Sequence, residues 1–165
     1  MEVALFEPRI PQNTGNIART CAAYNSPLNL IEPLGFRLED KYLKRAGLDY
    51  WHLVQVETYK NYEIFKRNKQ NKRILSFSKK NGVLLDEFIF QRNDVLLFGR
   101  EDKGLPNEII SQCNSLITIY MPNIQTDSTK KDGVRSLNLS VACGIALYEA
   151  NKQLKSFKNT YDDLK

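Results

Sequence analysis

Residues 132–150 read DGVRSLNLSVACGIALYEA, a polar loop that leads directly into an apolar segment. Apolar residues then recur at helical spacing, at Leu137, Val141, Ile145, Tyr148 and Leu154. This spacing predicts a helix over residues 137–157, with Ser136 as its N-cap and Gly144 allowing a neighbour to approach closely. A loop so rich in hydrogen-bonding groups at a helix start indicates a place where a ligand is held.

Short apolar runs alternate with helix-patterned segments along the rest of the chain. Strands are expected at 3–6, 28–32, 53–57, 73–78, 95–99 and 116–121. Helices are expected at 15–25, 39–46, 60–68, 84–89, 106–112 and 137–157. Strands with apolar residues at consecutive positions are typical of parallel sheets buried on both faces. The pattern predicts one α/β domain over residues 1–157, a mostly parallel sheet flanked by helices on both faces, with a flexible tail at 158–165.

Composition narrows the class of protein. The 165 residues are 42% apolar, which fits one folded domain and excludes a wholly disordered chain. The three cysteines, an odd number without Cys-x-x-Cys spacing, are expected to be reduced. His52 is the only histidine, so a His-rich metal site is excluded. No apolar run approaches the ~20 residues of a membrane span, and the first residues lack a secretory signal pattern, so a cytoplasmic protein is expected.

The positive charge is unevenly distributed. The net charge is +5 and the pI is about 9.1, with five cations and no acid in KRNKQNKR, residues 66–73. Further cations occur at Lys41, Lys44, Arg45, Lys79, Lys80, Lys130 and Lys131. A basic surface attracts polyphosphate, most simply nucleic acid. Solvated helix faces and loops explain the same charges equally well.

A second polar loop, EPRIPQNTGNIART, covers residues 7–20. It contains three turn or cap residues, Asn13, Gly15 and Asn16. They predict a helix that begins at Ile17, with Arg19 beside its exposed N–H groups. A cation is unfavourable at that end of a helix. Arg19 is therefore expected either to pair with a carboxylate such as Glu7 or to accompany a bound anion.

A third loop lies in LLFGREDKGLPNEII, residues 96–110, where a buried strand ends at Gly99. Ligands of open α/β sheets bind outside the carboxyl ends of the strands, which makes this junction a natural site with Glu101 at its mouth. Gly99 and Gly104 permit close backbone approach or a positive φ. The spacing matches neither a Walker phosphate loop nor the Gly-x-Gly-x-x-Gly fingerprint, so nucleoside triphosphates and nicotinamide cofactors lose support.

The order NTGNIART, FGREDKGLP and RSLNLSVACGIALYEA, with EPLGF (32–36) and RAGLDYW (45–51), resembles the SPOUT superfamily of RNA methyltransferases. Within it, the sequence is most similar to the compact branch that 2′-O-methylates the wobble nucleotide of tRNA, a cytidine or modified uridine at position 34. The resemblance extends from Val3 to about Phe157. It implies a C-terminal trefoil knot, S-adenosylmethionine (AdoMet) bound by the knot loops and released as S-adenosylhomocysteine, a tRNA substrate, a homodimer and no metal.

The resemblance also assigns roles to residues. Cofactor contacts fall at Phe77, Gly99, Glu101, Met121, Ser136 and Leu137, with Met121 ending a strand. The catalytic positions are Arg19, Tyr148 and Asn138. Arg19 is expected to bind the phosphate next to the target ribose and to hydrogen-bond its 2′-hydroxyl, because an arginine is not easily deprotonated. Tyr148 either acts beside the hydroxyl or packs in the core, while Asn138 and Asn16 would orient the pair.

Phosphate contacts with RNA are expected from the segment 66–73 and from Lys41, Lys44, Arg45 and Arg100. Tyr50 could stack on a base, whereas Trp51 is expected to pack in the core. The loop 123–134 is longer than the compact branch leads us to expect. Two other functions stay open: the same chemistry on another RNA 2′-hydroxyl, and a non-catalytic RNA-binding factor.

Overall fold

The computed structural model describes residues 1–38, 50–124 and 133–154. The expected helix at 39–46, the basic residues Lys41, Lys44, Arg45, Lys130 and Lys131, and the expected tail lie outside these ranges. The predicted trefoil knot depends on the path of residues 125–132, which also lie outside them.

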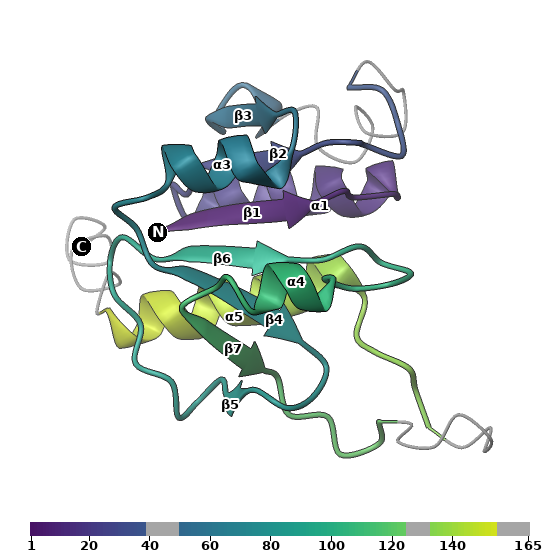
Figure 1. Cartoon of the computed structure of the whole chain (residues 1–165), viewed down its shortest axis with the longest axis vertical. Coiled ribbons are helices and arrows are strands. Elements are labelled where there is room, and N and C mark those ends of the chain that lie inside the picture. The colour runs from purple at the N-terminus through teal and green to yellow at the C-terminus, as the bar shows by residue number, and fades with distance from the viewer. Residues whose placement is uncertain (39–49, 125–132, 155–165) are drawn as a thin grey trace, which may run out of the picture.

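The fold is a parallel sheet of seven strands in the order β3-β2-β1-β6-β4-β7-β5 (Figure 1). The strands are β1 (Glu2–Phe6), β2 (Leu28–Ile31), β3 (Val56–Tyr59), β4 (Ile74–Ser78), β5 (Val83–Leu84), β6 (Val95–Phe98) and β7 (Ser115–Thr118). Within the described ranges, the helices are α1 (Pro11–Ala23), α3 (Tyr62–Asn68), α4 (Asn107–Ile110) and α5 (Leu139–Gln153).

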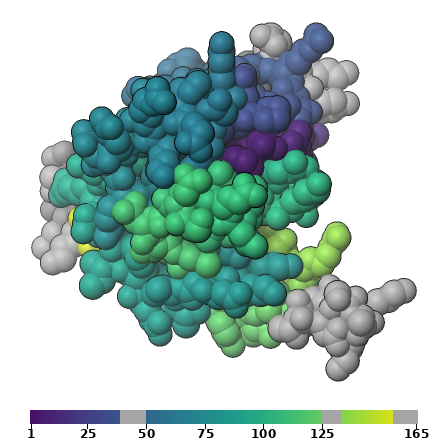
Figure 2. Space-filling view, in the orientation of Figure 1, coloured from purple at the N-terminus to yellow at the C-terminus, as the bar shows by residue number. Residues whose placement is uncertain are grey.

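Helices cover both faces of the sheet. Figure 1 shows α1 and α5 on one face and α3 and α4 on the other, and Figure 2 shows side chains of α3 and α4 covering the latter. Along β1, Val3 and Leu5 join the core beneath α1 and α5, while Ala4 and Phe6 join the core beneath α3 and α4. The predicted fold class is therefore confirmed.

Several elements differ from the sequence prediction. The strand expected at 53–57 is displaced to β3, because residues 51–54 form a turn in which the N–H of Val54 bonds the carbonyl of Trp51. The helix expected at 84–89 is absent from this described segment. Instead β5 ends in a turn at Leu84, whose carbonyl accepts the N–H groups of Glu87 and Phe88. Finally, β7 ends at Thr118 rather than at residue 121.

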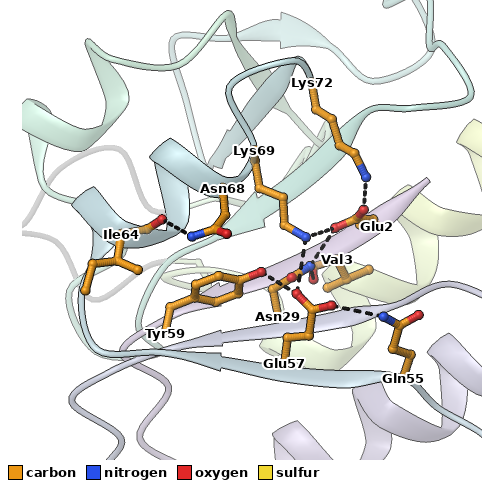
Figure 3. A network of polar contacts seen from close by, with 10 residues as sticks. All are labelled: Glu2, Val3, Asn29, Gln55, Glu57, Tyr59, Ile64, Asn68, Lys69 and Lys72. Atoms are coloured by element: carbon orange, nitrogen blue, oxygen red, sulfur yellow. Dashed lines mark hydrogen bonds and ion pairs between the residues drawn. The ribbon is translucent and has the colours of Figure 1, made fainter.

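A buried charge network fixes the amino-terminal edge of the sheet (Figure 3). Glu2 is only 7% exposed, and its Oε2 accepts from Nζ of Lys69 at 2.8 Å and from Nδ2 of Asn29 at 3.0 Å. Lys72 pairs with the other carboxylate oxygen. Burial alone would raise the pKa of Glu2, but the hydrogen bonds from Lys69, Lys72 and Asn29 outweigh it and lower the pKa to about 2.

We expect Glu2→Gln to lower the free energy of unfolding by about 3 kcal/mol at neutral pH. A carboxyl whose pKa is depressed on folding stabilises the protein above its unfolded pKa of 4.5, and this stabilisation is lost as the pH falls through about 2. Urea unfolding from pH 7 to pH 2 measures the effect, with the exposed Glu87→Gln as control. If the difference in the free energy of unfolding between the wild type and Glu2→Gln stayed constant down to pH 2, this account would be contradicted.

Candidate active site

A cavity of about 660 Å³ lies at the carboxyl ends of β4, β6 and β7. Phe77 of β4 and Phe98 of β6 line it with stacked rings, their centroids 4.5 Å apart at an interplanar angle of 18°. The loop that follows β6 and the residues from 135 to 139 form further walls. A volume of this size, with an apolar floor and polar loops, is typical of a small-molecule site.

All six residues expected to contact the cofactor line this cavity: Phe77, Gly99, Glu101, Met121, Ser136 and Leu137. Met121 does so from three residues beyond the end of β7, not from the strand itself. Asn138 and Arg100 also line the cavity. The sequence prediction missed other lining residues, among them Ile10, Asn13, Lys79, Lys103, Leu105, Ile119, Leu139 and Ala142. Most of these are ordinary apolar residues that no motif distinguishes.

The turn after β6 requires both of its glycines. Arg100 and Gly104 exchange two backbone hydrogen bonds, of 3.1 and 2.9 Å, and Gly104 has a φ of +68°. A Cβ at Gly99 would overlap the carbonyl carbon of Gly104 and lie 2.6 Å from its oxygen. Gly99 is therefore needed for close backbone approach, and Gly104 is needed for its positive φ.

Glu101 fastens this turn to the start of α1. Its Oε2 accepts the N–H of Arg9 at 2.8 Å, and its Oε1 accepts from the N–H of Ile10 and from Nδ2 of Asn13, both at 3.1 Å. The N-cap of α1, Ile10, has no side chain able to accept such bonds. Glu101 therefore fixes the residues just before α1 and the side chain of Asn13 from a distant part of the chain, at a helix start where a negative charge is favourable.

Asn138 continues this chain of contacts to α5. Its Nδ2 donates to Oδ1 of Asn13 at 3.0 Å, and its Oδ1 accepts the N–H of Ser140 at 2.9 Å. Asn138 is thus the N-cap of α5, and the prediction of Ser136 as the cap was wrong because the helix begins at Leu139. Through Glu101, Asn13 and Asn138, the starts of both helices are tied to the cavity wall.

The structure corrects the predicted surroundings of Arg19. Because α1 begins at Pro11 and not at residue 17, Arg19 lies in the second half of the helix, away from its exposed N–H groups. Its guanidinium lies 4.7 Å from the ring centroid of Tyr50. Glu7, the carboxylate considered as its partner, pairs with Arg9 at 2.7 Å and with Arg100 at 3.3 Å.

Arg19 and Tyr148 stand apart from the other predicted site residues, because neither lines the cavity. Tyr148 is 52% exposed on α5, the helix that packs beside α1. Asn16 lies within α1, where its carbonyl accepts the hydroxyl of Thr20. Within one copy of the chain, Asn138 therefore does not bring Arg19 and Tyr148 together at the cavity.

Several predicted RNA contacts are engaged in internal ion pairs. Arg100 makes a two-pronged contact with Asp102, with distances of 2.9 and 2.7 Å, and the hydrogen bond from Arg100 lowers the pKa of Asp102 to about 2. Within the segment 66–73, Lys69 and Lys72 bind Glu2, and Arg73 binds Asp94 at 2.6 Å. This leaves fewer of these cations available to RNA than the sequence indicated.

The remaining sequence expectations concern cysteines, metals and aromatic residues. The cysteines are free, as predicted, with Cys21 and Cys143 buried. Within the described ranges, no group of three or more His, Cys, Asp and Glu side chains could hold a metal ion. No helix in the same ranges is long and apolar enough to cross a membrane. Trp51 packs against the core as expected, and His52 is exposed.

The parallel sheet and the cavity at its carboxyl edge define an α/β protein with a ligand site formed by loops at the strand ends. The sequence matches the SpoU rRNA Methylase family over residues 1–148, and the chain belongs to that family.

The tRNA (cytidine(34)-2'-O)-methyltransferase of Methylovorus glucosotrophus is 39% identical over 152 residues, covering 92% of this chain and 94% of that protein. A solved structure that concerns the 2-OH methylation of C/U34 on tRNA aligns with a TM-score of 0.85 and 43% identity, over 94% of this chain and 96% of that one. The AdoMet-bound rRNA methyltransferase of Sinorhizobium meliloti aligns with a TM-score of 0.78 and 27% identity, over 93% of this chain and 56% of that one.

Proposed function

We propose that the protein is an AdoMet-dependent tRNA 2′-O-methyltransferase that modifies the wobble nucleotide at position 34 and acts in the cytoplasm. The observation that carries the proposal is one cavity lined by all six residues to which the resemblance assigns cofactor contacts. Relatives of similar length at about 40% identity support the substrate, since the Methylovorus protein is described as acting on cytidine 34 of tRNA.

The lining residues fit AdoMet. The stacked rings of Phe77 and Phe98 offer an apolar floor, and the backbone groups around Gly99, Met121 and Leu137 can bond the edge of an adenine. When bound, AdoMet supplies a methyl group already activated by its sulfonium. The lining residues would hold this methyl group where it could pass to the hydroxyl oxygen as the carbon–sulfur bond breaks, with the hydroxyl proton lost to an acceptor.

The protein then contributes mainly alignment, which can supply about 7–11 kcal/mol of the barrier. We assign Arg19 to the phosphate beside the target ribose and to a hydrogen bond with the 2′-hydroxyl, with Tyr148 beside it. Asn138 acts as a positioning residue, because it holds the start of α5 and the adjacent cavity wall in place through Asn13.

A homodimer would complete this site. The outer face of α5 carries Val141, Ile145 and Tyr148, which are 49, 38 and 52% exposed. A Cβ at Gly144 on the same helix would meet nothing within 4 Å in its own chain. If Gly144 serves to let another element approach α5 closely, that element would therefore belong to a second copy of the chain. Arg19 and Tyr148 lie outside the cavity of their own chain. We propose that they serve the cavity of a partner subunit packed across α5.

Methyl transfer from labelled AdoMet to an anticodon stem-loop tests the proposed function. We expect label in an all-ribose stem-loop and none in a matched one with 2′-deoxyribose at position 34. Label in both oligonucleotides would keep the chemistry and overturn the assigned position, favouring another 2′-hydroxyl. Binding of AdoMet and RNA with no transfer to tRNA or ribosomal RNA would favour the non-catalytic factor.

A further inference from the structure

Two exposed lysines stand at the mouth of the cavity on neighbouring strand ends. Lys79 directly follows β4, and Lys103 lies in the turn after β6. Because β4 and β6 are adjacent and parallel, their carboxyl ends lie at the same edge of the sheet. Both lysines are exposed, whereas Phe77 and Phe98 on the floor are buried. The two ammonium groups therefore face solvent at the entrance, where an incoming substrate passes.

The charges around the cavity are unbalanced. Four cationic residues line it against two acidic ones, Glu101 and Asp102. Both carboxylates are already engaged, Glu101 by three N–H donors and Asp102 by Arg100. Within the described ranges, no carboxylate lies within 4 Å of the ammonium groups of Lys79 and Lys103. AdoMet would not restore the balance, because its single carboxylate is accompanied by an ammonium and a sulfonium.

The most basic segment of the sequence does not compete for this role. Lys69 and Lys72 are bound to Glu2, the first residue of β1. Arg73 is bound to Asp94, which directly precedes β6. These ion pairs lie at the amino-terminal edge of the sheet, opposite the cavity. The lysines at the cavity mouth are thus better placed to meet a polyanion than the cations of the segment 66–73.

We infer that Lys79 and Lys103 form a phosphate subsite that holds the RNA backbone on either side of the target ribose. The inference rests on the proposed function. The reacting 2′-hydroxyl must reach the methyl group inside the cavity, and the two phosphodiesters that flank that ribose must then lie near its mouth. Lysine suits this role because its flexible point charge can follow a backbone without reading a base.

The test is the salt dependence of RNA binding by Lys79→Gln/Lys103→Gln in the full-length chain. Each phosphate contact contributes about 0.7 to the slope of log K against log salt for a single strand, so the slope should fall by about 1.4. If the wild type and the double variant bind the stem-loop equally at 1 M salt, the double variant should bind it about 25-fold more weakly than the wild type at 0.1 M salt. Fluorescence anisotropy gives the slope, and calorimetry gives AdoMet binding, which should be unchanged.

Arg92→Gln is the matched control, because Arg92 is exposed and precedes β6 at the opposite edge of the sheet. A loss of about 0.7 in the slope of Arg92→Gln would overturn the subsite, because one charge removed far from the cavity would then have half the effect of the two lysines and the effect would be one of net charge. Weaker AdoMet binding with an unchanged slope would also overturn it and place the lysines on the cofactor carboxylate. If the wild-type protein methylates RNA and the double variant keeps the wild-type slope, the phosphate subsite is wrong and the proposed function stands. If the wild-type protein does not methylate RNA, the proposed function itself is wrong.

Discussion

Replacing Gly99 by alanine will abolish measurable AdoMet binding. The added Cβ would overlap the carbonyl carbon of Gly104, and the paired hydrogen bonds between Arg100 and Gly104 prevent the turn from simply moving away. Overpacking costs about 1–3 kcal/mol where side chains can move aside, and the cost is greater here because the overlap is with backbone atoms. Any displacement of the turn also moves Glu101 and weakens its three hydrogen bonds to the start of α1. The cavity wall and the helix that borders it would therefore shift together.

Isothermal titration with AdoMet measures the binding, and thermal unfolding measures the accompanying loss of stability. Glu87→Gln is the control, because Glu87 is exposed and does not line the cavity. We expect this control to bind AdoMet as the wild type does. A Gly99→Ala protein that bound AdoMet normally would show that the turn does not shape the cofactor site.

The sheet could be predicted from the sequence because its strands are buried on both faces. The residues of β1, for example, supply two cores in alternation, so consecutive apolar residues are required by the fold itself. The apolar spacing of Val141, Ile145 and Tyr148 predicted the helix α5 but not its core face, because these three side chains are exposed. Short elements have too few residues to show a period, so the local pattern predicted a helix at 84–89 in place of β5 and its turn, and a longer helix than α4.

The start of α1 shows what a local pattern cannot contain. Residues from Asn13 to Asn16 look like cap and turn residues, yet they lie inside the helix. Glu101, far along the chain, accepts the N–H groups of Arg9 and Ile10 just before the helix, and Pro11 occupies a first-turn position where a missing N–H has no cost. The same limit applies to α5. Its N-cap is Asn138 and not Ser136, and the side chain of Asn138 also bonds Asn13, a contact distant in sequence that a local pattern does not contain.

The candidate site was predictable to different degrees. The glycines and Glu101 were visible as features of a strand-end loop, whereas Phe77, Met121 and Leu137 came only from the family resemblance. Lys79 was noted only as a charge and Lys103 was not singled out, and their sequence context does not reveal that they share a cavity with Phe77. Counting cations also misled at residues 69–73, because burial beside Glu2 and Asp94 depends on which strands become neighbours.

Arg19→Ala will lower methyl transfer by at least about 100-fold, the loss that follows removal of one preorganised transition-state donor. AdoMet binding should persist, because Arg19 does not line the cavity of its own chain. Initial rates with the anticodon stem-loop and calorimetry with AdoMet separate the two effects. A fall in AdoMet affinity that accounted for the whole loss of rate would contradict the role given to Arg19.

Mixing Arg19→Ala with Gly99→Ala subunits then decides which chain supplies the arginine. If Arg19 serves the partner's cavity, a heterodimer contains one complete site, made of the cavity of the Arg19→Ala subunit and the arginine of the Gly99→Ala subunit. Random exchange between two equal pools should restore about a quarter of the wild-type rate. If Arg19 served its own cavity, every subunit in the mixture would lack either the arginine or the cofactor, and no activity would return. The recovery of activity from two inactive proteins thus depends on a shared site across α5.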